Sequence, residues 1–177
     1  MPMKAMIIIP PRDFRDETVS LAMLLLGKWG VRPVIASYLG EGKSCIGAHG
    51  ATYKPEINAT KATSEGFDAL LIVDGPGVES YKLSDFRPLV ELVKDFINHK
   101  KVVAALGDSV KVVARANVIT DRKVAAPSDD EVSRMIRIYR GKESKNEMEF
   151  DKFLLTAKGN GHLEQFLDAL IEGMGAK

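Results

Sequence analysis

Three residues separate two apolar segments near the middle of the chain, and two of them carry polar side chains that can bind or position a ligand. They are Gly107, Asp108 and Ser109. The preceding segment, 102–106, is a continuous apolar run, typical of a strand buried on both faces of a parallel sheet. The following segment, 110–114, is compatible with a helix. Because ligands collect at the carboxyl ends of strands in open α/β sheets, this bend is a candidate site. The alternative is an ordinary loop in which Asp108 or Ser109 only caps the helix.

The other reactive side chains form no recognisable catalytic or metal-binding pattern. The three histidines lack metal-ligand spacing, so neither a zinc site nor any other metal is predicted. Ser109 has no adjacent histidine, and its surroundings, GDSV, do not match the G-x-S-x-G motif of serine hydrolases. Cys45 is interpreted either as a redox-sensing thiol near a dimer contact or as a small, partly buried residue. No cofactor is predicted.

Composition indicates a globular protein in a reducing compartment, and we expect a cytoplasmic location. Of the 177 residues, 45% are hydrophobic and 28% charged, which does not favour disorder. The net charge is +1 and no basic block stands out, so nucleic-acid binding is not expected. A single cysteine excludes an intrachain disulfide. The apolar run near the N-terminus ends at Pro10 and Pro11, too early to span a membrane or serve as a signal peptide.

Buried strands alternate with helices along the chain, and these elements must position the bend. We predict strands at 4–9, 32–38, 67–73, 102–106 and 152–156, and helices at 16–29, 86–99, 129–139 and 163–174. Asp16 and Ser128 are the expected caps of two of these helices, and the charged segment 141–149 is expected to be an exposed connection. This order predicts an α/β fold, with a doubly wound, mostly parallel sheet and helices on both faces. We expect a single domain over residues 1–177, a flavodoxin-like three-layer sandwich.

Several stretches, in the right order, resemble the PfpI/ThiJ family, a class I glutamine amidotransferase-like superfamily that includes the parkinsonism-associated chaperone and glyoxalase-like proteins. The resemblance covers residues 4–130 well and the rest loosely. It is carried by the segments KAMIIIPPRDFRDETVSLAMLLL, PVIASYLGEGKSCIGAHG, FDALLIVDGPG, HKKVVAALGDS and DRKVAAPSDD. The third is similar to the family's FDALVLPGG strand and turn, and the fourth to its GKPVAAICHG bend.

The family's chemistry depends on a cysteine in that bend, often a neighbouring histidine, and a glutamate from the loop after the first strand. Matched position by position, Gly107 stands at the cysteine position and Asp108 at the histidine position. The first loop, FRDET, places Arg15 and Thr18 at the two glutamate positions of FEDxE, although Glu17 serves if the loop is shifted by one residue. Since glycine has no attacking atom, the resemblance does not imply cysteine-dependent hydrolase, peptidase, deglycase or glyoxalase activity.

The replaced positions define a candidate pocket with two interpretations. Its residues are Arg15, Asp16, Glu17, Asp74, Gly75, Gly107, Asp108 and Ser109. In the first interpretation it is open and binds a small polar ligand, since arginine suits a carboxylate or phosphate. The aspartates suit instead a hydroxyl-rich or cationic ligand, or a hard divalent cation with water. In the second, a salt bridge between Arg15 and Asp108 closes it, because partly buried charges are usually paired.

Two classes of function follow. The first is a non-catalytic or divergent family member with a ligand-binding, chaperone-like or assembly role. The alternative is a hydrolase or lyase with relocated acid–base chemistry at Asp108, Asp74 or Glu17. A closed charge pair favours the first, and a carboxyl group that titrates near neutrality favours the second. The family resemblance also implies a homo-oligomer, a dimer or larger; neither a nucleic acid nor a membrane is expected as a partner.

Overall fold

The computed structural model describes residues 2–38 and 42–177, which form a seven-stranded sheet covered by helices on both faces. The strand order is β10-β11-β7-β6-β1-β2-β5, and every neighbouring pair is parallel except β10 with β11. The strands are β1 (Lys4–Ile8), β2 (Arg32–Ser37), β5 (Ile57–Asn58), β6 (Ala69–Ile72), β7 (Val102–Leu106), β10 (Met148–Asp151) and β11 (Leu154–Ala157). This confirms the predicted α/β fold.

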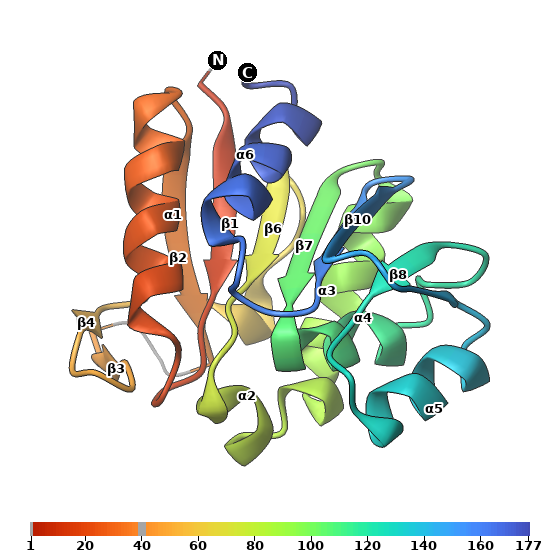
Figure 1. Ribbon diagram of the computed structural model, residues 1–177. Coiled ribbons are helices and arrows are strands. Elements are labelled where there is room, and N and C mark those ends of the chain that lie inside the picture. The colour runs from red at the N-terminus through yellow and green to blue at the C-terminus, as the bar shows by residue number, and fades with distance from the viewer. Residues whose placement is uncertain (1, 39–41) are drawn as a thin grey trace.

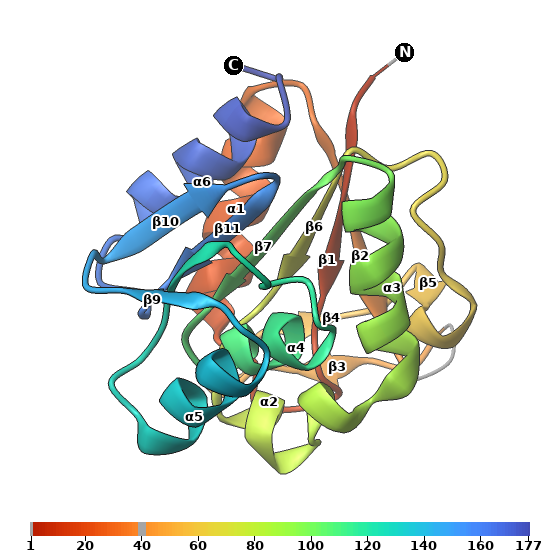
Figure 2. The same ribbon diagram turned by 90° about the vertical axis from the view of Figure 1, so that its right-hand side faces the viewer.

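Two apolar cores, one on each face of the sheet, make the three layers visible in Figures 1 and 2. One core lies beneath α1 (Asp16–Lys28) and α6 (Leu163–Gly173). The other lies beneath α3 (Arg87–Asn98), α4 (Val110–Arg115) and α5 (Asp130–Ile138). The central strands β1, β6 and β7 read as continuous apolar runs because they are covered on both sides.

Smaller elements flank the sheet, and the first two of them lie near the carboxyl ends of its strands. They are the hairpin β3 (Cys45–Ile46) and β4 (Thr52–Tyr53), the short helix α2 (Pro76–Ser80), and the parallel pair β8 (Lys123–Ala125) and β9 (Lys142–Ser144). Three single-turn 3₁₀ segments, η1 (Ala59–Lys61), η2 (Leu83–Asp85) and η3 (Gly107–Ser109), complete the fold. Both termini lie at the opposite end of the sheet (Figure 1). Within the described residues, no helix is long and apolar enough to cross a membrane.

The structure corrects the expected connection at 141–149 and both expected helix caps. The connection contains β9 and the start of β10, strands whose charged residues are tolerated because they are largely exposed. Asp16 is the first residue of α1 rather than its cap, and the cap residue is Arg15. Asp129, not Ser128, caps α5, accepting hydrogen bonds from the backbone N–H groups of Glu131 and Val132. The sequence also predicts a loop or short hairpin over 39–50, and residues 39–41 of it lie outside the described residues.

Candidate functional site

The candidate site lies between β1 and β6, where the strand order changes direction: β2 lies on one side of β1, and β6 and β7 lie on the other. The chain leaves β1 toward α1 on one face, and leaves β6 toward α2 and α3 on the other. The two strands pair directly, with Ile8 opposite Ile72, so the two loops start at the same level. Ligands bind preferentially in the crevice at such a topological switch point.

Short backbone contacts hold the loop after β1 against the loop after β6. Arg15 N–H donates to the Asp74 carbonyl at 2.8 Å, and Gly77 N–H donates to the Asp13 carbonyl at 2.9 Å. Gly75 makes this approach possible, because its φ is +126° and a Cβ there would lie 2.7 Å from the backbone of Arg15 and Asp13. The positions of Arg15 and Asp74 are therefore fixed by backbone geometry.

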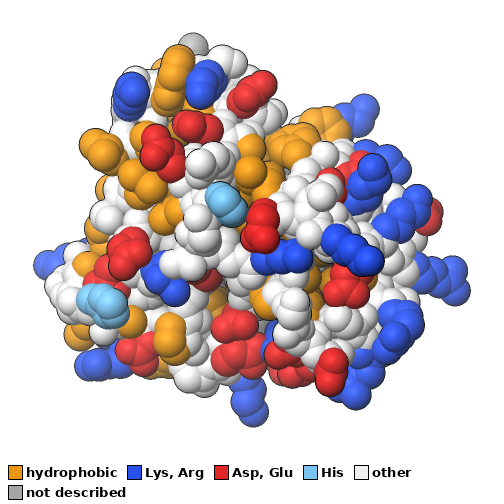
Figure 3. All heavy atoms as spheres, viewed as in Figure 1, with side chains coloured by type: hydrophobic (Ala, Val, Ile, Leu, Met, Phe, Trp, Pro, Cys, Tyr) orange, Lys and Arg blue, Asp and Glu red, His pale blue; other side chains and the backbone are white. Residues whose placement is uncertain are grey.

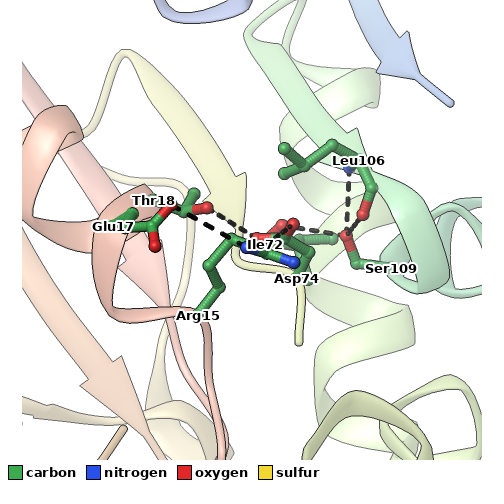
Figure 4. Close-up of polar contacts among 7 residues, drawn as sticks. All are labelled: Arg15, Glu17, Thr18, Ile72, Asp74, Leu106 and Ser109. Atoms are coloured by element: carbon green, nitrogen blue, oxygen red, sulfur yellow. Dashed lines mark hydrogen bonds and ion pairs between the residues drawn. The ribbon is translucent and has the colours of Figure 1, made fainter. Parts of the chain in front are cut away.

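Asp74 is the buried centre of the site and is paired on the side that faces α1. Its side chain accepts a hydrogen bond from the Thr18 hydroxyl at 2.7 Å and one from Arg15 Nε at 3.1 Å (Figure 4). Only 5% of Asp74 is exposed. Burial raises the pKa of its carboxyl group, and the contacts with Thr18 and Arg15 offset part of that rise.

The Arg15 side chain pairs with Asp74 through Nε, and its terminal nitrogens lie nearer the surface contacts with Asn160 and Glu17. The side-chain oxygen of Asn160, assigned to face the guanidinium, accepts from Nη1 at 2.7 Å, and Glu17 lies 3.9 Å from the same nitrogen. No described residue accepts a hydrogen bond from the other terminal nitrogen, Nη2. The side chain is 36% exposed, so Arg15 retains donor capacity at the mouth of the site.

A cavity of about 160 Å³ opens beside Arg15, on the side of the β3–β4 hairpin. It is lined by Arg15, Asp16, Glu17, Ala48, His49, Gly75 and Pro76. The Asp16 carboxylate accepts the backbone N–H groups of His49 at 2.9 Å and of Ala51 at 2.8 Å, which anchors the hairpin to α1. Burial is the largest single influence and raises the pKa of the Asp16 carboxyl group, but the backbone donors, His49 and Ala51 first among them, together outweigh it and lower the pKa. Both carboxylate oxygens of Asp16 therefore already accept hydrogen bonds, whereas Glu17 and His49 are exposed at the cavity.

The bend at 107–109 lies next to Asp74 but does not line this cavity. Gly107 has φ of +58°, and a Cβ there would be 3.6 Å from the Asp74 Cβ, an ordinary contact distance. Ser109 is fully buried, and its hydroxyl contacts the carbonyls of Ile72 and Leu106 at 2.9 and 2.8 Å (Figure 4). Its hydroxyl ties β6 to β7, which is a structural role.

Arg15 forms its buried-side ion pair with Asp74 and none with Asp108, so the predicted salt bridge between Arg15 and Asp108 is wrong. The partner of Arg15 is Asp74, because β6 is the strand adjacent to β1 and β7 is one strand further. Burial raises the pKa of the Asp108 carboxyl group, and the neighbouring Glu79 raises it further. Sequence reasoning missed Lys111, whose 7% exposed side chain bonds Glu79 at 2.6 Å and Glu131 at 3.1 Å. The sequence signal that could have identified it is the single lysine within the otherwise apolar segment 110–114.

The one cysteine lies away from the bend. Cys45 is in β3 and fully buried, and burial raises the pKa of its thiol, although a contact with Ser37 partly opposes the rise. This environment does not favour reaction with solutes. Among the described residues, no three His, Cys, Asp or Glu side chains are grouped so as to hold a metal ion. Charged side chains of both signs surround the mouth of the site (Figure 3).

Known proteins of the same fold include a ThiJ/PfpI domain protein from Brachyspira murdochii and DJ-1beta from Drosophila melanogaster. The first is 21% identical with a TM-score of 0.88, and the alignment covers 98% of this chain and 97% of that chain. The second is 17% identical with a TM-score of 0.81, covering 100% and 92%. At these identities the likeness concerns the fold alone.

Sequence comparison identifies a nearer relative and the family. The chain is 33% identical over 121 residues to the uncharacterized protein MJ0967 of Methanocaldococcus jannaschii, covering 68% of this chain but only 57% of the relative. The family model described as DJ-1/PfpI family matches residues 3–173, nearly the whole chain. The protein therefore belongs to the DJ-1/PfpI family.

Proposed function

We propose that this protein is a non-catalytic family member that binds a small carboxylate in the cavity beside Arg15. The observation that carries this proposal is the open cavity at the switch point, lined by Arg15, whose Nη2 has no acceptor among the described residues. Arginine forms strong, directional hydrogen bonds to carboxylates. The volume of about 160 Å³ equals roughly five water molecules. That space fits an organic acid of a few carbon atoms.

The other polar groups of the cavity narrow the ligand class. Glu17 is ionisable, exposed and not engaged by a backbone donor, so it can accept a hydrogen bond from a ligand hydroxyl or amino group. Asp16 is excluded from this role because both of its oxygens already accept backbone N–H groups. A short hydroxy acid, with its carboxylate on Arg15 and its hydroxyl toward Glu17, matches this arrangement.

Calorimetric titration with lactate, and with lactamide as the matched neutral ligand, tests this proposal. Lactate is expected to bind and lactamide is not. Arg15→Gln should weaken lactate binding by about tenfold or more, the loss of one charge-assisted hydrogen bond. Arg12→Gln, an exposed arginine of the same loop outside the cavity, is the control. Glu17→Gln gives a second variant should Arg15→Gln not fold. Equal binding of lactate and lactamide, or equal lactate affinity in all variants, would exclude the proposal.

The non-catalytic part of the proposal rests on the missing thiol. Gly107 supplies no nucleophile at the bend, and the buried Cys45 is a poor one. Turnover of a dicarbonyl or an activated ester should therefore match the buffer blank in both the native protein and Cys45→Ser. A rate that disappears in Cys45→Ser would show that thiol chemistry survives.

A second candidate function, acid–base catalysis as a hydrolase or lyase, is favoured by the raised pKa of Asp108. Such a group holds a proton at higher pH than an ordinary aspartate and suits a general acid. Of the other predicted carboxylates, Asp74 is occupied by Thr18 and Arg15. A pH–rate profile whose acid limb is lost in Asp108→Asn would favour this second function over the first.

We also propose that the protein forms a homodimer through the outer face of α1. Leu24 is 67% exposed at the middle of this face, between the exposed charges Glu17 and Lys28. Figure 3 shows hydrophobic side chains over the upper part of α1. Two antiparallel copies of α1 would place Leu21 opposite Leu24, and Glu17 opposite Lys28, in both directions. The face is therefore complementary to itself.

Sedimentation velocity of Leu24→Glu tests this interface. The substitution adds a charge at the centre of the proposed contact and should convert a dimer to a monomer. Ile138→Glu is a matched control, since Ile138 of α5 is similarly exposed, at 62%. A native protein that is monomeric at high concentration would refute the proposed dimer, as would an equal effect of the two substitutions.

A further inference from the structure

A second cavity, about 280 Å³ in volume, lies at the carboxyl end of β11 and outside the site described above. It is lined by Ala126, Ser128, Glu143, Ser144, Lys145 and Lys158. Three segments distant in sequence form its wall, and Figure 2 shows them meeting beside β9: the loop before α5, the turn after β9, and the end of β11. The cavity shares no lining residue with the one beside Arg15.

The wall residues are held by paired strands. Ala125 pairs with Ser144 in the parallel β8–β9 ladder, so the segments that follow, with Ser128 and Lys145, leave from the same end. Lys158 directly follows β11, and its backbone N–H donates to the Glu147 carbonyl at 3.0 Å. Sites supported by regular elements hold their geometry better than sites on free loops.

Two of the polar side chains in the wall already form hydrogen bonds. Glu143 accepts a hydrogen bond from the Ser133 hydroxyl at 2.7 Å. The Ser144 hydroxyl donates to Glu149 at 2.6 Å and accepts the Asn146 backbone N–H at 3.0 Å. The Ser144 hydroxyl is therefore occupied, whereas Glu143 accepts a single hydrogen bond and keeps its negative charge.

Lys145, Lys158 and Ser128 remain, and the side chain of each can donate hydrogen bonds. Within 2–38 and 42–177, neither Lys145 nor Lys158 has an acidic partner within 4.0 Å, in contrast to Lys111 with its two glutamates. The Ser128 hydroxyl also has no partner in that part of the chain, since Asp129 caps α5 in its place. Lys145, Lys158 and Ser128 thus line one cavity without a side-chain partner among the described residues, and Glu143 is the only carboxylate in its lining.

We propose that this cavity binds a phosphate group, with Lys145, Lys158 and Ser128 as its ligands. The two lysines outnumber Glu143, which leaves the wall net positive, and each ammonium group supplies several donors to phosphate oxygens. The volume corresponds to roughly nine water molecules. Inorganic phosphate and a small phosphate monoester share this chemistry, and the larger volume favours the monoester.

Isothermal titration of the full chain, in phosphate-free buffer at low salt, tests this site. The probes are inorganic phosphate, glycerol 3-phosphate and neutral glycerol. Both phosphates are expected to bind and glycerol is not. Lys145→Gln and Lys158→Gln should each weaken binding by about tenfold, the loss of one charge-assisted hydrogen bond. Tighter binding of glycerol 3-phosphate identifies a monoester as the ligand, whereas equal affinities identify free phosphate.

Two controls separate this site from general charge effects and from the cavity beside Arg15. Lys152→Gln removes the same charge from an exposed lysine in the turn between β10 and β11, and should leave affinity unchanged. Arg15→Gln should also leave phosphate affinity unchanged, even where it abolishes lactate binding. No phosphate binding at millimolar concentration would overturn the proposal, and so would equal losses in Lys145→Gln, Lys158→Gln and Lys152→Gln.

Discussion

Replacing Arg15 by alanine should destabilise the protein, because it strands a buried carboxylate. Asp74 is 5% exposed and would keep only the Thr18 hydroxyl as a side-chain donor. Breaking a fully buried ion pair costs about 3–5 kcal/mol, while a surface pair contributes at most about 1 kcal/mol. The Arg15 side chain is 36% exposed, so solvent screens part of the interaction. We therefore expect a loss of about 2 kcal/mol in the free energy of unfolding.

Urea and thermal denaturation followed by circular dichroism measure this loss. For a domain of this size, about 2 kcal/mol lowers the melting temperature by roughly 4–8 °C. Arg12→Ala is the matched control, because Arg12 is exposed in the same loop and should change stability by less than about 0.5 kcal/mol. In the double variant Arg15→Ala/Asp74→Asn, the stranded charge is gone, so the combined loss should be smaller than the sum of the single losses.

The cost of Arg15→Ala should also depend on pH. Burial raises the pKa of Asp74, so the folded state holds its proton more tightly than the unfolded state. For such an acid, the free energy of unfolding rises as pH falls from the folded pKa toward the unfolded value of about 3.9. Loss of the guanidinium raises the folded pKa further. The difference between variant and native protein is thus largest near neutral pH and shrinks in acid. A melt at pH 7 that overlays the native one would refute this reasoning.

Three further substitutions address the bend, the hairpin and the buried lysine. Gly107→Cys should fold with a strain of about 1–2 kcal/mol from its positive φ, and should add a thiol that reacts with Ellman's reagent in the native state, unlike buried Cys45. Asp16→Ala should cost about 2 kcal/mol near pH 7 by leaving two backbone donors unpaired. Because the folded pKa of Asp16 is lowered, a urea titration series should show this cost disappearing as pH falls below about 3.9. Lys111→Met should stay within about 1 kcal/mol of the native protein in a thermal melt, since the half-exposed glutamates regain water and an apolar side chain replaces a buried charge. A larger loss would show that the ion pairs hold α4 in place.

The central strands could be predicted from the sequence because burial on both faces leaves an unambiguous signal. β1, β6 and β7 are short, continuous apolar runs ended by polar or turn-forming residues. β9 and β10 could not be predicted in this way. β9, KES, has no apolar residue, and β10, MEFD, alternates apolar and polar residues over only four positions, too short a stretch to stand out inside a charged segment. α2 was also missed, since its Pro76 and Gly77 are more typical of a turn than of a helix.

The candidate residues lie at the carboxyl ends of the strands, as the sequence predicts, but the predicted partner of Arg15 is wrong. A sequence does not say which strands are neighbours, and the partner of Arg15 depends on β6 lying beside β1. The sequence predicts Asp108 as the partner, and the strand order explains why it is Asp74 instead. Asp16 shows a second limit: an acidic residue at a helix start suggests a cap, but here its oxygens bind the distant hairpin at His49 and Ala51.

The geometry separates the bend from the cavity, and this separation distinguishes the two candidate functions. The carboxylate of Asp74 turns toward Thr18 and Arg15, so the charges of the first loop meet on the α1 side (Figure 4). None of the three bend residues lines the cavity beside Arg15. If recognition belongs to the first loop, Asp108→Asn should leave lactate affinity unchanged while Arg15→Gln weakens it. If the chemistry stays at the bend, Asp108→Asn should abolish turnover, whatever its effect on binding.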